Sequence, residues 1–91
     1  MKKSAQLATE MKHVLDLRGM IVPFTLLKFT HGFRKMGTGE IMEIIGTYPD
    51  TRKDVLEVLA KLPCKLLCVR NGKDRFLIRL RKLTGGEAQA R

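Results

Sequence analysis

The spacing of apolar residues in this chain switches repeatedly between the pattern of a strand and that of a helix. Residues 14–17 and 40–45 are short apolar segments bounded by glycine turns, so both favour strands. Each is followed by a stretch with one apolar stripe at helical spacing. The stripes consist of Leu26, Phe29, Phe33 and Met36 in the first stretch, and of Val55, Val58, Leu59 and Leu62 in the second. The chain is therefore expected to begin β-α-β-α.

Proline and glycine mark the ends of the two predicted helices. Pro23 suits the first turn of the first helix, because the N–H that proline lacks would have no helical partner there, and this helix is expected to end near Gly37. Thr51 and Asp54 have the spacing of a capping box, with aspartate in place of glutamate, and are expected to open the second helix. Pro63 is expected to stop it.

The C-terminal third of the chain has the pattern of a hairpin. Residues 65–70 and 75–82 flank a loop at 71–74 that begins with an Asn-Gly step, which is typical of a turn between two antiparallel strands. The full order is then β-α-β-α-β-β. This order predicts an α+β protein, a two-layer α/β sandwich in which two helices cover one face of a four-stranded mixed sheet.

A chain of 91 residues favours a single domain. We assign the domain to residues 12–83, with a flexible N-terminal lead at 1–11, anchored at most by Leu7 and Met11, and a disordered C-terminal tail at 84–91. No apolar stretch reaches the roughly 18 residues of a membrane span, and the N-terminus lacks the order of a signal peptide. We therefore expect a cytoplasmic protein with no membrane partner.

The two cysteines, Cys64 and Cys68, are spaced C-x-x-x-C. In an extended strand this spacing separates their Cα atoms by about 13 Å, whereas a disulfide needs about 7 Å or less. Two thiols do not complete a four-ligand zinc site, and His13 and His31 are not at a zinc-finger spacing. Two reduced cysteines and neither a metal nor a cofactor are expected.

The segment at residues 15–28 reads Leu-Asp-Leu-Arg-Gly-Met-Ile-Val-Pro-Phe-Thr-Leu-Leu-Lys. It resembles the signature of the TusA-like (SirA-type) sulfur-carrier family, roughly L-D-x-R/x-G-x-x-C-P-x-P before an apolar helix. Val22 stands at the cysteine position and Thr25 at that of the second proline. Further along, residues 39–44 are similar to a G-E strand of the family, and residues 76–82 look like its closing strand. Over about seventy residues, the resemblance implies the same two-layer fold.

The resemblance places the sulfur-carrying cysteine of the family where a turn after the first strand leads into the first helix. Unpaired N–H groups and the positive end of the helix dipole stabilise a thiolate or persulfide there. The side chain of Val22 neither ionises nor accepts sulfur, so no catalytic residue is assigned and an enzymatic role has little support. Asp16 is expected to shape the turn after the first strand and to pair with Arg18.

The first functional hypothesis is a non-catalytic domain that binds a protein partner, such as a component of a sulfur relay. The binding surface would be the one around residue 22, where the family has its sulfur-carrying cysteine. The contact residues would be apolar ones at the start of the first helix, rimmed by cations: Met20, Val22, Pro23 and Phe24 with Arg18, Lys28 and Lys35. The alternative is that Ile21, Val22 and Phe24 pack into the core.

The second hypothesis is nucleic-acid or other polyanion binding. The net charge is +9, and Arg75, Arg79 and Arg81 alternate with apolar residues on the last predicted strand. Together with Lys65 and Lys82 they would form a positive stripe on the uncovered sheet face that contacts phosphates. The alternative is a solvated face that serves solubility.

The third hypothesis moves sulfur carriage to another thiol. Cys64 is expected near a helix C-terminus, where the dipole raises the pKa of a thiol. Cys68 is expected among the buried strand residues Leu66, Leu67 and Val69. Both environments argue against a carrier thiol, although Lys61 and Lys65 would partly offset the dipole at Cys64.

Overall fold

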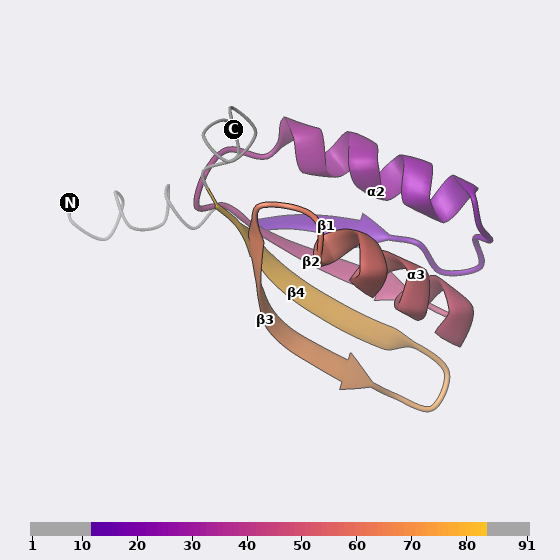
Figure 1. Ribbon diagram of the computed structural model, residues 1–91. Coiled ribbons are helices and arrows are strands. Elements are labelled where there is room, and N and C mark those ends of the chain that lie inside the picture. Colours follow the sequence, from indigo (N-terminus) through magenta and orange to yellow (C-terminus); the bar gives the residue numbers. More distant parts are fainter. Residues whose placement is uncertain (1–11, 84–91) are drawn as a thin grey trace.

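The computed structural model describes residues 12–83 and contains two helices and four strands (Figure 1). In chain order they are β1 (Lys12–Asp16), α2 (Phe24–Lys35), β2 (Ile41–Gly46), α3 (Pro49–Leu59), β3 (Cys64–Asn71) and β4 (Phe76–Lys82). The predicted flexible lead with Leu7 and Met11 and the predicted disordered tail lie outside the described residues. Within residues 12–83, neither helix is long and apolar enough to cross a membrane.

The four strands form one mixed sheet in the order β1-β2-β4-β3. Strand β1 pairs with β2 in parallel, and β4 pairs antiparallel with both β2 and β3. Helices α2 and α3 lie together on one face of this sheet (Figure 1). The predicted α+β sandwich of β-α-β-α-β-β order is confirmed.

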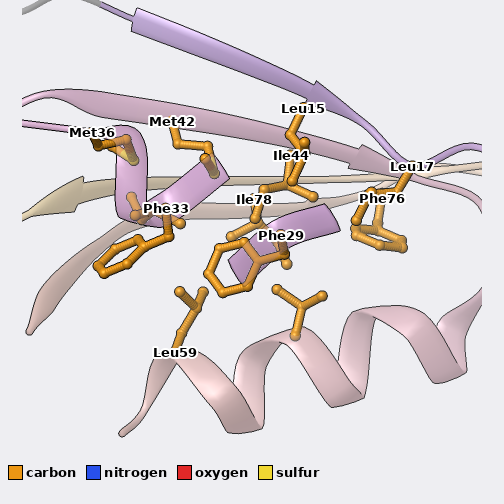
Figure 2. Packing of buried hydrophobic residues seen from close by; sticks show 12 residues of the cluster. Leu15, Leu17, Phe29, Phe33, Met36, Met42, Ile44, Leu59, Phe76 and Ile78 are labelled. Atoms are coloured by element: carbon orange, nitrogen blue, oxygen red, sulfur yellow. The ribbon is translucent and has the colours of Figure 1, made fainter. Parts of the chain in front are cut away.

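The core lies between this sheet face and the two helices (Figure 2). Phe29 and Phe33 of α2 pack with ring centroids 5.8 Å apart. Alternate residues of the central strands meet them, because successive side chains of a strand point to opposite faces. The buried apolar residues of the central strands are Met42 and Ile44 in β2 and Phe76, Ile78 and Leu80 in β4, and Leu15 of β1 is buried as well.

The second helix begins earlier than the sequence suggested. Pro49 is its first residue, Tyr48 precedes it, and no side chain caps the helix. Thr51 is buried inside the first turn, so the capping-box prediction for Thr51 and Asp54 is wrong. The reason is that Pro49 is itself suited to the first helical position, where its fixed φ and missing N–H cost nothing.

Lys82 ties the end of β4 to the end of α2. Its Nζ donates to the carbonyl oxygens of Phe33 and Met36, both at 2.9 Å, and lies 4.6 Å from the centre of the Phe33 ring. A cation at a helix C-terminus is stabilised by the helix dipole. Lys82 shares a face with Leu80 and Ile78, so its predicted place on the uncovered sheet face is wrong.

Gly46 and Phe76 form a cross-strand pair on the covered face. A Cβ added at Gly46 would lie 2.2 Å from Cζ of the Phe76 ring, so a side chain and this ring cannot share the position. We expect Gly46→Ala to lower the free energy of unfolding by about 1–3 kcal/mol, the usual cost of overpacking a core. Urea denaturation measures this.

Gly32→Ala is the matched control for Gly46→Ala. A Cβ at Gly32 would lie 3.2 Å from Cε of Met42, the end of a flexible side chain, and alanine favours a helix interior over glycine by roughly 1 kcal/mol. This variant is expected to be as stable as the wild type or more so. Equal destabilisation by both alanines would contradict the role of the Phe76 ring.

Candidate functional site

The loop between β1 and α2 lies at the end of the sheet where the two parallel strands finish. The Leu17 N–H donates to the Ile45 carbonyl at 2.7 Å, and the Gly19 N–H donates to Oγ1 of Thr47 at 3.0 Å. Gly19 has a φ of +77°, which glycine adopts at little cost. The loop is thus held by its own turn and by the segment that follows β2.

Asp16 and Arg18 form the ion pair that the sequence predicted. The guanidinium of Arg18 donates through Nε to Oδ1 at 2.9 Å and through Nη2 to Oδ2 at 2.8 Å. The Arg18 backbone N–H also donates to Oδ1, at 3.0 Å. These hydrogen bonds are the main reason that the pKa of Asp16 is lowered to about 2, with a smaller contribution from Lys28 through space. Asp16 therefore fixes the turn at the start of the site.

The turn leads into four exposed apolar side chains, which we call the loop–helix patch. The exposed fractions are 59% for Ile21, 38% for Val22, 58% for Phe24 and 65% for Leu27. Met20, by contrast, is partly buried and packs against the core. The alternative that Ile21, Val22 and Phe24 all pack into the core is therefore wrong.

Sequence reasoning missed half of this patch. The sequence pattern places Ile21 only in the core and gives no role to Leu27. The available signal was the helical spacing itself, because Leu27 falls off the buried stripe of Phe29 and Phe33 and next to exposed Lys28.

The predicted cationic rim is only partly brought together. Arg18 precedes the patch, and Lys28 lies close enough to Asp16 to lower its pKa. Lys35 is the last residue of α2 and lies at the opposite end of this helix, roughly 16 Å from Phe24 at 1.5 Å per residue. The rim thus consists of Arg18 and Lys28, without Lys35.

The first turn of α2 keeps the electrostatic character of a helix N-terminus. It contains no acidic residue, and Pro23 directly precedes the helix without a side-chain cap. The N–H groups of Thr25 and Leu27 bond to the carbonyls of Ile21 and Pro23. The Thr25 hydroxyl is buried and has no partner among the described residues. The first turn therefore supplies no acidic side chain to the positive end of the helix, and the apolar Val22 lies just before it.

The uncovered sheet face is more neutral than the sequence suggested. Arg79 is hydrogen bonded to the carboxylate of Glu43, with Nε at 2.9 Å, and Lys12 lies 3.5 Å from the same carboxylate. Hydrogen bonding by Arg79 is the main cause that lowers the pKa of Glu43. Arg81 donates to the Gly39 carbonyl at 3.3 Å. Of the predicted stripe, Lys65 is exposed on β3 and Arg75 lies in the hairpin loop.

Both cysteines are free thiols and half-buried. Cys64 Sγ donates to the Leu59 carbonyl at 3.5 Å, near the C-terminal end of α3, and burial raises its pKa. Cys68 does not lie among buried residues as predicted, because its neighbours Leu66, Leu67 and Val69 are exposed. Strand β3 is one of the two edge strands of the sheet, and its register shifts between Leu66 and Cys68.

Within residues 12–83, no group of three or more His, Cys, Asp or Glu side chains could hold a metal ion. One comparison with known proteins is informative: the model of the family described as sulfurtransferase TusA matches residues 13–82. The match covers the two helices and nearly all of the sheet. No curated protein matches the chain.

The Asp16–Arg18 pair has a measurable pH signature. The pKa of Asp16 is lowered from 3.8 to about 2 in the folded protein, so the ionised carboxylate favours the fold. This contribution is complete above the unfolded pKa and is lost as the pH falls through the folded value. An NMR titration of the carboxyl carbon should show a midpoint near pH 2, and Arg18→Gln should move it towards 3.8.

Lys28→Gln is the control for this titration. It removes a cation that acts on Asp16 only through space, the weakest of the causes, and should move the midpoint less than Arg18→Gln does. A midpoint that stays near pH 2 in Arg18→Gln would show that the side-chain pair does not set it.

Proposed function

We propose that this chain, which belongs to the TusA family, acts in sulfur transfer by binding a protein partner and does not itself carry sulfur at residue 22. The family connects the chain with sulfur carriers and with proteins of the sulfur relay. The observation that carries the proposal is Val22, which is 38% exposed at the start of α2, where the family signature has its cysteine.

Chemistry at the helix N-terminus supports the loss of carriage. A carrier needs a thiolate, and a helix N-terminus provides one by lowering the pKa of a cysteine. A valine side chain has no atom that takes part in thiol exchange. The two cysteines of the chain are poor substitutes, because burial raises the pKa of Cys64 and Cys68 lies within strand β3 and not in the first turn of a helix.

The loop–helix patch supports a role in binding. Its four side chains, Ile21, Val22, Phe24 and Leu27, are exposed and adjacent in the chain, with Arg18 and Lys28 at the rim. Apolar centres with polar rims are typical of protein–protein contacts. Burial of such a patch contributes a favourable term of about 25 cal/mol for each Å² of apolar surface removed from water, which opposes the entropy cost of association. We propose a cysteine desulfurase or another sulfur-relay protein as the partner.

Restoring the cysteine tests the loss of carriage. The protein is incubated with a cysteine desulfurase and cysteine, and its intact mass is measured before and after reduction. Val22→Cys should gain about 32 Da that reduction removes, because the thiolate at residue 22 takes the terminal sulfur of the donor persulfide and leaves the donor as a thiolate. The wild type should gain nothing.

The same measurement with Cys64→Ser/Cys68→Ser in the Val22→Cys background shows which thiol is loaded. A reducible gain of one sulfur atom by the wild type, lost in Cys64→Ser or Cys68→Ser, would contradict the proposal and assign carriage to that cysteine. An authentic carrier in the same reaction confirms that the donor is active.

Substitutions in the patch test the binding role. Phe24→Ser and Leu27→Ser, each made in the chain with Val22 retained, should weaken its binding to a cysteine desulfurase by about tenfold or more. The reason is that a few well-packed side chains at the centre of an interface provide most of the binding free energy. Leu66→Ser is the matched control, since Leu66 is 47% exposed but lies on β3. Isothermal titration calorimetry gives the affinities. Equal weakening by all three variants, or no binding by the wild type, would overturn the proposed surface or partner.

A further inference from the structure

Three cations gather at the tip of the β3–β4 hairpin, residues 70–75. Arg70, Lys73 and Arg75 are all exposed. Within residues 12–83, no ion pair involves any of them. The acid in the same segment is Asp74, so the hairpin tip carries a surplus of two positive charges.

The tip is a fixed structure. The Gly72 N–H donates to the Arg75 carbonyl at 2.7 Å and closes the loop. Nη1 of Arg52, on α3, donates to Oδ1 of Asn71 at 2.7 Å and ties the tip to the helix layer. The cations are therefore presented on a backbone that is held in place from two sides.

Three hollows meet at this tip, and Arg75 lines all of them. One, of about 460 Å³, lies between the tip and the β1–α2 loop and is lined by Arg18, Lys73, Asp74 and Arg75. A second, of about 370 Å³, opens towards the uncovered sheet face and has Arg70 and Arg75 beside the apolar side chains of Ile45 and Leu77. Arginines next to apolar side chains suit a ligand that has both carboxylates and apolar side chains, because the guanidinium groups bind the carboxylates and the apolar surfaces pack together.

Strand pairing places this tip at the same end of the molecule as the loop–helix patch. Phe76, the first residue of β4, pairs with Gly46, the last residue of β2, and Asp16, the last residue of β1, pairs with Ile45. The tip and the β1–α2 loop therefore extend from one end of the sheet (Figure 1). Arg18 is close to both surfaces, since it precedes the loop–helix patch and lines the hollow of about 460 Å³ beside the hairpin tip.

The cations of the hairpin tip are not paired with acids among the described residues, whereas two other arginines of the domain are. Arg79 is neutralised by Glu43, and Arg18 by Asp16. Among residues 12–83, Arg75, Lys73 and Arg70 form no ion pair with an acid, so their positive charge remains available to attract anions.

We propose that the hairpin tip docks an acidic segment of the protein partner that covers the loop–helix patch, with carboxylates bound by Lys73, Arg75 and Arg70. This inference rests on the proposed binding role and adds the chemistry of the partner. Asp74 and Asp16 break up the basic surface, which disfavours the continuous run of phosphates in a nucleic acid. A carboxylate-bearing peptide places its charges individually and avoids those two acids.

An NMR titration of the full chain, labelled with ¹⁵N, tests the proposal. The probe is a capped peptide, Glu-Leu-Glu-Glu-Leu-Glu, and the matched control is Gln-Leu-Gln-Gln-Leu-Gln. We expect the acidic peptide to shift amide signals of residues 70–76 and Arg18, with an effect that salt weakens, and the neutral peptide to shift none. Lys73→Glu/Arg75→Glu should weaken peptide binding about tenfold or more, because like charges then face each other.

Arg34→Glu/Lys35→Glu is the matched control variant. It makes the same change in net charge at exposed positions in the last turn of α2, far from the hairpin tip, and should leave the affinity for the acidic peptide unchanged. Shifts spread evenly over the basic surface, or equal weakening by both double variants, would overturn the docking site. Tighter binding of a single-stranded oligothymidylate at the same residues would also overturn it, in favour of a nucleic acid. The titration needs no desulfurase and is judged on residues 70–76, which lie outside the loop–helix patch, so its failure is distinct from failure of the proposed function.

Discussion

The contact between the Phe76 ring and the backbone of Gly46 holds β2 and β4 together at the end of the sheet where the candidate site lies. The missing side chain at Gly46 leaves the space that the ring fills, since an added Cβ would lie 2.2 Å from the ring. This contact joins the last residue of β2 to the first residue of β4. The hairpin tip therefore begins beside the last residue of β2, at the same end of the sheet where the Leu17 and Gly19 N–H groups hold the β1–α2 loop.

Arginine has three different roles in this small domain. Arg18 pairs with Asp16 and shapes the turn before α2, while Arg79 pairs with Glu43 on the uncovered sheet face. Arg75 has no acidic partner within the described residues and lines the hollows around the hairpin tip. A net charge of +9 therefore says little about binding until the local acids are known. In the proposed docking role, the positive surplus that binds the partner is at the hairpin tip.

The order of the elements could be predicted from sequence, because strand and helix periods and their Gly and Pro boundaries are local signals. The exposure of Leu66, Leu67 and Val69 could not, because the same apolar run suits either a central or an edge strand, and only the order β1-β2-β4-β3 decides between them. The start of α3 was missed because Pro49 outweighs the capping pattern of Thr51. At the site, the turn of Asp16 and Arg18 was predicted, but the exposure of Leu27 depends on how α2 is rotated against the sheet.

Valine at residue 22 changes the physical character of the helix N-terminus. A thiolate there would be stabilised by the dipole of α2 and would prefer water or a donor persulfide. Val22, with Ile21, Phe24 and Leu27 around it, is instead stabilised by being covered. In the proposed role this favours a lasting contact over a brief transfer, because the free energy comes from buried apolar area and from fixed charges at the hairpin tip, and neither is consumed in a reaction. A partner surface with an apolar centre and acidic residues beside it would cover the loop–helix patch and pair with the cations of the hairpin tip at the same time.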